Sequence, residues 1–236
     1  MSDSIEISLW YITVVICFIM MIIFIIQYKK RDSLQRPFFL GLVMFSICYT
    51  VARLIENIRR YQIGSYNDIF EAWVAGDQIT GLNFILRFLY YFIAWIGITI
   101  MFFNIERHIL KNNKYFLTIV SATEGTVSII NYINFNLITF WLAAILFFVV
   151  LFMPLMFLNL ARKTPAGSVR RASIIIAIGI TLFAIGVMID LPEFSYVNYL
   201  LGTLSLEETI RLVAPIIIIT ALLLLNFGFR TFFPRK

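Results

Sequence analysis

The chain has few charges and few of the residues that build metal or catalytic centres. Only 14% of its 236 residues are charged, against roughly a quarter in soluble domains. It has one histidine and two cysteines. A globule of this length needs a more polar composition to cover its surface. The composition therefore excludes an ordinary soluble domain, and we predict neither a metal site nor a cofactor.

Further absences exclude particular chemistries. No lysine lies within an apolar block, which excludes a retinal Schiff base. His108 has no cysteine or carboxylate at metal-ligand spacing, and no glycine-rich phosphate loop occurs. Cys17 and Cys48 both lie in apolar blocks, so we expect buried thiols rather than a disulfide. We predict that the chain is not an enzyme and binds no nucleic acid.

Apolar residues are abundant, at 61% of the chain. They gather in blocks of about 20 residues, the length that crosses a hydrocarbon core of roughly 30 Å. We therefore predict an all-α polytopic membrane protein, a single domain over residues 1–236 with about seven transmembrane helices. The expected spans are 8–28, 38–58, 81–105, 115–133, 136–160, 172–190 and 207–229. The fourth carries the most polar residues, so a six-span arrangement with a re-entrant fourth segment stays open.

Basic residues fall mainly in alternate connections between the predicted spans. Because cytoplasmic loops carry an excess of lysine and arginine, we predict a cell-membrane protein with its N-terminus outside and its C-terminus in the cytoplasm. This topology places 14 of the 19 basic residues on the cytoplasmic face. They are Lys29, Lys30, Arg31, Arg36, Arg107, Lys111, Lys114, Arg162, Lys163, Arg170, Arg171, Arg230, Arg235 and Lys236.

Two connections on the predicted outer face contain aromatic residues. The longest runs from Tyr61 to Thr80. It is either a short amphipathic helix on the membrane interface or a surface loop anchored by Trp73. The segment 191–205 holds Phe194 and Tyr196, which are typical of an interfacial aromatic belt.

Ionisable residues inside the spans give the strongest functional signal, because they usually face the bundle interior or a water-filled cavity. Arg53, Glu56, Asn57 and Arg60 stand at i, i+3, i+4 and i+7, which places them on one helix face. The fourth span carries a polar stripe around Glu124. Under the predicted topology, charges from four spans lie at similar depth toward the outer side. The predicted ligand-binding residues are Arg53, Glu56, Arg87, Tyr90, Glu124, Glu208 and Arg211.

Two interpretations of these charges stay open. They line an outward-facing polar cavity, or they form a packed ion-pair cluster that fixes helix packing. For Arg59, Arg60 and Glu207 we expect side chains that extend to the outer interface. At the other end of the third span, Glu106 precedes two basic residues, which we interpret as a helix C-terminus whose cations complement its dipole.

The layout resembles the seven-helix membrane sensor modules at the N-termini of prokaryotic histidine kinases and cyclic-nucleotide enzymes. The resemblance rests on Arg36-Pro37-Phe38-Phe39 before the second span and on Leu86-Arg87-Phe88-Leu89-Tyr90-Tyr91 in the third. It implies a sensor. No kinase or cyclase domain follows within this sequence, so the resemblance also implies a separate cytoplasmic or membrane protein partner that reads the signal.

The resulting hypothesis is an orphan membrane sensor or receptor-like protein that binds a small polar or anionic ligand in an outer cavity. One alternative is a small proton-coupled secondary transporter that uses Glu124. Helix breaks at Gly125, Pro154 and Pro215 would strengthen it. Another is a structural subunit of a membrane complex whose charges pair with a second chain. Membrane lipids are partners in every case.

Overall fold

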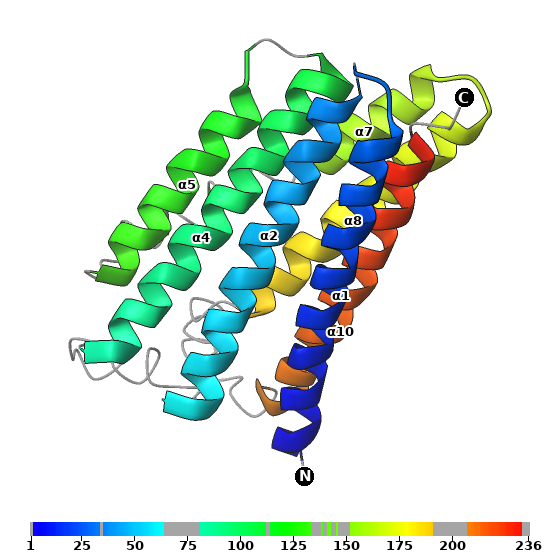
Figure 1. Cartoon of the computed structure of the whole chain (residues 1–236). Helices are drawn as coiled ribbons and strands as arrows, with labels where there is room; N and C mark the ends of the chain where they lie inside the picture. Colours follow the sequence, from blue (N-terminus) through cyan, green and yellow to red (C-terminus); the bar gives the residue numbers. More distant parts are fainter. Residues whose placement is uncertain are drawn as a thin grey trace. The chain divides into compact units, whose positions relative to one another are not determined.

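The computed structural model describes residues 2–33, 35–63, 81–111, 114–133, 152–190 and 207–232, and also residues 138, 141, 142 and 145. The side chains of residues 2, 3 and 207–211 are outside this description. The regular elements of these ranges are all helical (Figure 1). They are α1 (Ser2–Lys30), α2 (Arg36–Ile58), α4 (Gly81–Ile105), α5 (Phe116–Ile133), α7 (Phe152–Lys163), α8 (Ser168–Asp190) and α10 (Glu207–Phe232), with the π-helical turns η1 (Arg59–Ile63) and η2 (Glu106–Leu110).

Six of these helices are long and apolar enough to cross a bilayer. They are Ser4–Lys30, Arg36–Ile63, Gly81–Leu110, Phe116–Ile133, Ser168–Asp190 and Leu212–Phe232. The all-α prediction is confirmed for the described residues, and the chain is a multi-span helical membrane protein. The sequence left open whether the fourth predicted span, 115–133, crosses the membrane fully or re-enters it. In the structure, α5 is one continuous helix over Phe116–Ile133. Most of the first part of the predicted span 136–160, up to residue 151, lies outside the described residues, which include the rest of it in α7, so the seventh crossing stays a prediction.

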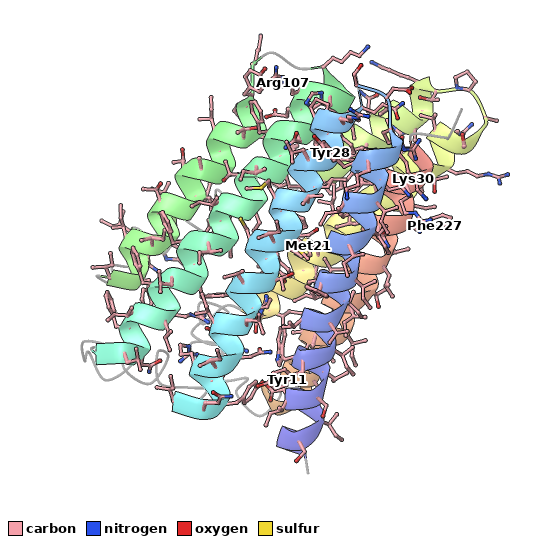
Figure 2. All side chains as sticks on the ribbon, viewed as in Figure 1. Tyr11, Met21, Tyr28, Lys30, Arg107 and Phe227 are labelled. Atoms are coloured by element: carbon pink, nitrogen blue, oxygen red, sulfur yellow. The ribbon has the colours of Figure 1, made fainter. Side chains whose placement is uncertain are left out.

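The chain divides into two compact units. Unit 1 consists of Met1–Ile16 and Leu151–Lys236, and unit 2 of Cys17–Val150, so that α1 contributes to both. In unit 2, α4 packs between α2 and α5 (Figure 1). Lys30 and Arg107 lie at one end of this unit (Figure 2). The end of α2 and the start of α4, which we call the α2–α4 end, lie at the opposite end (Figure 1). The assignment of either end to the cytoplasm stays a prediction.

Glycines bring the helices of unit 2 close together. A Cβ atom at Gly97 of α4 would lie 2.7 Å from the Cβ of Cys48 on α2. One at Gly125 of α5 would lie 2.8 Å from the Cγ of Trp95 on α4. Small residues at such points let backbones approach within contact distance, which is a main source of packing energy between helices in lipid.

Glycines also bring the helices of unit 1 close together. Helix α8 packs against both α7 and α10. A Cβ at Gly186 of α8 would lie 2.6 Å from Ile218 on α10, and one at Gly228 of α10 would lie 2.6 Å from Ile176 on α8. Apolar side chains of one helix therefore occupy the space that a larger residue on the other would need.

Two sequence predictions fall on segments that are not described. The outer connection beyond Ile63, as far as residue 80, and the segment 191–205 lie outside the described residues. The interfacial helix or loop and the aromatic belt therefore stay predictions. Both cysteines are free thiols: Cys17 is buried, as its apolar surroundings predicted, whereas Cys48 is only half-buried.

Glu106 is a structural cap rather than only part of a helix C-terminus. Its side chain is fully buried at the end of α4. Its Oε1 accepts a hydrogen bond from the Leu117 N–H (3.0 Å), and its Oε2 accepts from the Thr118 N–H (2.9 Å) and hydroxyl (2.6 Å). These N–H groups belong to the first turn of α5, which has no intrahelical acceptors for them. The carboxylate satisfies them and places a negative charge at the positive end of the helix dipole.

We expect Glu106→Ala to lower the free energy of unfolding by about 1–3 kcal/mol, because it leaves buried donors without an acceptor. Unfolding of the purified protein in a mild detergent measures this loss. Thr118→Val, which removes one of the three bonds, is expected to cost less. Thr123→Val is the control, because that exposed hydroxyl bonds only to the carbonyl of Ile119 in its own helix. Equal effects of the two threonine substitutions would contradict the capping role.

Candidate functional site

Charged side chains gather at the α2–α4 end. Arg53 and Glu56 share one face of α2, and the helix continues into η1, whose wider turn carries Arg59 and Arg60. Arg87 comes from α4. Each of these five side chains is at most 5% exposed. We call them the arginine cluster. π-helical turns are rare and often occur at functional sites.

The carboxylate of Glu56 is the centre of the cluster. Arg59 donates its Nε to Oε2 and its Nη2 to Oε1, both at 3.1 Å. Arg60 donates its Nε to Oε1, and Arg87 donates its Nη1 to the same atom from the neighbouring helix. One carboxylate therefore joins two guanidinium groups of its own helix to one of α4. Arg59 makes a second link to α4, because its Nη1 donates to the Oδ1 of Asn83 at 2.9 Å.

Aromatic rings separate the guanidinium groups. The Arg53 guanidinium carbon lies 5.2 Å from the Tyr49 ring centre and 5.5 Å from that of Tyr90. The Arg87 carbon lies 4.8 Å from the ring centres of both Tyr90 and Tyr91. Tyr90 thus lies between two cations from different helices. Cation–π contacts of this kind are worth about 2 kcal/mol or more when the pair is removed from water.

Helix α5 joins the cluster through aromatic contacts. The ring centres of Tyr91 and Tyr132 lie 5.7 Å apart, and those of Tyr132 and Phe84 lie 5.3 Å apart. The Tyr132 hydroxyl donates to the Phe84 carbonyl at 3.4 Å. Aromatic contacts therefore connect the α2–α4 end to the end of α5.

Sequence spacing located much of this cluster. The structure brings together the predicted residues Arg53, Glu56, Arg87 and Tyr90. Their role in binding a ligand stays a prediction. The predicted Glu208 and Arg211 lie on α10, but their side chains are outside the described residues.

Glu124 is buried in the polar stripe that the sequence indicated on α5. Ser121, Ser128 and Asn131 of this stripe are also buried. The Ser121 hydroxyl lies 3.4 Å from the hydroxyl of Thr99 on α4. The stripe therefore faces the interior of unit 2, as its helical spacing predicted.

The prediction that Arg59 and Arg60 extend to the outer interface is wrong. Both are buried, because they stand three and four residues after Glu56, one helical turn away, and pair with its carboxylate. Sequence reasoning also missed Tyr49, whose hydroxyl accepts from the Nε of Arg53 at 3.1 Å. Its position four residues before Arg53 was the available signal, because residues i and i+4 share a helix face.

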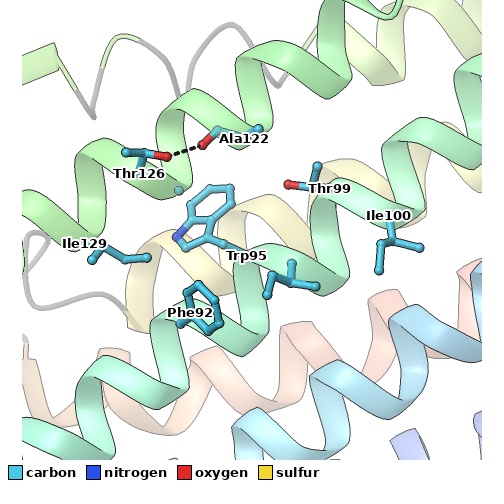
Figure 3. Close-up of a pocket in the computed structure, with 9 residues that line it drawn as sticks. Phe92, Trp95, Thr99, Ile100, Ala122, Thr126 and Ile129 are labelled. Atoms are coloured by element: carbon cyan, nitrogen blue, oxygen red, sulfur yellow. Dashed lines mark hydrogen bonds between the residues drawn. The ribbon is translucent and has the colours of Figure 1, made fainter.

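A second feature of unit 2 is an apolar groove of about 250 Å³ between α4 and α5 (Figure 3). The ring of Trp95 lies in it, between the two helices. The Thr126 hydroxyl at its edge donates to the Ala122 carbonyl of its own helix. Of the predicted ligand-binding residues whose side chains are described, none lines this groove. It is therefore a separate feature from the arginine cluster.

No family model, curated protein or solved structure matches this chain in the comparisons with known proteins. The resemblance to the membrane modules of sensor kinases therefore stays a prediction. Within the described ranges, no three histidine, cysteine, aspartate or glutamate side chains gather as a metal site would require. The arginine cluster is consequently the main candidate site among the described residues.

Proposed function

We propose that this chain is an integral membrane sensor or receptor-like protein, and that its arginine cluster binds a small polar or anionic ligand. The observation that supports the proposal is the convergence of buried guanidinium groups from α2 and α4 on the single carboxylate of Glu56. Under the predicted topology, this cluster lies toward the extracellular side of the membrane.

The ratio of charges favours an anion as the ligand. Among the described residues, Arg59 and Arg87 form ion pairs with no carboxylate other than Glu56. Two cations therefore share one anion in a region from which water is largely excluded. Guanidinium groups carry several donors in a fixed plane and remain charged when buried, which suits them to binding anions.

The mechanism follows from competition for these donors. A ligand that binds Arg59 or Arg87 displaces Glu56, and the ion pair between α2 and α4 is broken. Buried ion pairs have a large desolvation cost, so they often contribute more to specificity and switching than to stability. A ligand that prefers the opened arrangement shifts the population toward it. Helix α4 and its continuation η2 then connect this change to the Glu106 cap at the far end of unit 2.

The test is the thermal unfolding of the purified protein in detergent with a panel of small anions, at constant ionic strength. The panel contains acetate, succinate, phosphate, nitrate and chloride. We expect at least one anion to raise the unfolding temperature, because binding to the folded state stabilises it by mass action. Arg87→Met is expected to abolish the increase, whereas Arg162→Met, at an exposed arginine of α7, is expected to retain it. No shift with any anion would contradict the proposal.

A second candidate function is proton-coupled transport, which is favoured by the burial of Glu124 within α5. Solute flux in proteoliposomes, with Glu124→Gln as the control, tests it. Helices α5 and α10 run continuously through Gly125 and Pro215, so the breaks that would have strengthened this candidate do not occur at those positions. The structural-subunit alternative is disfavoured because Glu56 has its partners within its own chain, and mass measurement after mild extraction tests it.

A further inference from the structure

The donors around Glu56 match a planar group with two oxygens. The Nε and Nη2 of Arg59 form a parallel pair of hydrogen bonds to the two carboxylate oxygens, both 3.1 Å long. Oε1 also accepts from Arg60 and Arg87. Four N–H groups thus meet one carboxylate, and two of them hold it in the plane of a guanidinium. Guanidinium groups commonly bind carboxylates in this bidentate way, with one N–H donating to each oxygen.

We infer that the ligand class of the arginine cluster is a small carboxylate, which takes the place that the Glu56 carboxylate occupies in the closed arrangement. This inference rests on the proposed function and narrows it to one chemical class. Recognition would come from Arg59 as the bidentate donor and from Arg87 as the donor of the neighbouring helix.

Two neighbouring groups disfavour other anions. The Oδ1 of Asn83 accepts from the Nη1 of Arg59, so an acceptor oxygen already occupies the outer edge of that guanidinium. A tetrahedral phosphate would bring additional negative oxygens toward it. The rings of Tyr90 and Tyr91 cover the Arg87 guanidinium and leave its edge for in-plane hydrogen bonds. Chloride is a single acceptor atom, so it cannot accept two parallel hydrogen bonds from the Nε and Nη2 of Arg59.

The chain offers a direct chemical test. Glu56→Ala keeps the Cβ atom and removes the group Cγ–COO⁻, which has the size and charge of acetate. The variant therefore retains the arginines and Asn83 with an acetate-sized space between them. Acetate added to the buffer is expected to restore at least about half of the lost unfolding temperature, because it binds the folded state only. Acetamide is the matched control, since it has the same shape without the charge.

The variant is purified and unfolded in acetate, formate, acetamide, phosphate and chloride at one ionic strength. Restoration by acetate or formate, with little effect of the other three, supports the inference. Equal restoration by chloride or phosphate would overturn it, and so would the absence of any difference between acetate and acetamide. If the variant cannot be isolated, the test is made on the wild-type protein. A larger increase in unfolding temperature with acetate than with phosphate supports a carboxylate ligand, and an equal or smaller increase refutes it.

The two proposals fail in different ways. If the wild-type protein responds to phosphate or nitrate but the variant is not restored by acetate, the binding function stands and the carboxylate class is wrong. If acetate restores the variant but no anion affects the wild-type protein, the donors recognise carboxylates but do not serve as a ligand site. The second result would contradict the sensor proposal and leave the arginine cluster as an internal ion-pair network.

Discussion

Glu56→Gln is expected to lower the free energy of unfolding by about 3–5 kcal/mol, because it leaves buried guanidinium groups without their shared counter-ion. Glutamine keeps the size of the side chain and one acceptor oxygen. The decrease in the free energy of unfolding therefore measures the effect of removing the charge and not that of creating a cavity. Equilibrium unfolding of the purified protein in mixed detergent micelles measures it.

Arg162→Gln serves as the control for removing a charge, because Arg162 is exposed on α7. It is expected to change the free energy of unfolding by no more than about 0.5 kcal/mol, as is usual for surface substitutions. A loss below about 1 kcal/mol for Glu56→Gln would indicate that the arginines do not depend on this carboxylate. The cluster would then be an incidental arrangement of charges rather than the link between α2 and α4.

Gly97→Ala is expected to lower the free energy of unfolding by about 1–3 kcal/mol through overpacking of α4 against α2. The new Cβ atom would lie 2.7 Å from the Cβ of Cys48. A Cβ atom is fixed to the backbone, so the contact can be relieved only by moving the helices apart. Gly167→Ala is the control, because the nearest neighbour of its added Cβ would be the Pro165 carbonyl oxygen at 4.0 Å.

Second-site substitutions make this prediction specific. Cys48→Gly removes the atom in conflict and is expected to recover part of the loss caused by Gly97→Ala. Cys48→Ala keeps the Cβ atom and is expected to recover none of it. Equal behaviour of the two double variants would contradict the helix contact, because both remove the thiol and only one removes the Cβ atom.

The helices could be predicted from the sequence because the bilayer sets their length. The predicted span 81–105 matches α4 (Gly81–Ile105), and 115–133 differs from α5 (Phe116–Ile133) by one residue. Helices α1 and α8 begin before their predicted spans, because hydropathy marks the apolar part of a helix and not its polar ends. The turns η1 and η2 had no signal in the apolar pattern.

The sequence predicted which residues of the candidate site share one helix face, but it could not predict which residues pair across two helices. The spacing of Arg53 and Glu56 placed both on one face of α2, because that relation depends only on the helical period. The pairing of Glu56 with Arg87 depends on the register of α2 against α4, which Gly97 and Cys48 help to set. The burial of Arg59 depends on its bonds to Glu56, three residues earlier, and to Asn83 of α4, and the second of these also requires the register between the helices.

Glu106 illustrates the same limit. Its neighbours along the chain indicated a helix end, whereas its partners are eleven and twelve residues further on, at the start of α5. A capping residue usually stands within three positions of the donors that it satisfies. Only the return of the chain after η2 brings this carboxylate to the next helix.

The central claim is that the buried ion pairs of Glu56 hold α2 to α4 through Arg87. A double-mutant cycle with Glu56→Gln, Arg87→Met and the double variant measures this coupling directly. We predict that the double variant loses less stability than the sum of the single variants, by about 1.5–3 kcal/mol, because Glu56→Gln alone leaves Arg87 buried without its carboxylate, whereas the double variant removes that unpaired charge. Losses that add within about 0.5 kcal/mol would show that the two side chains act independently and would contradict the account.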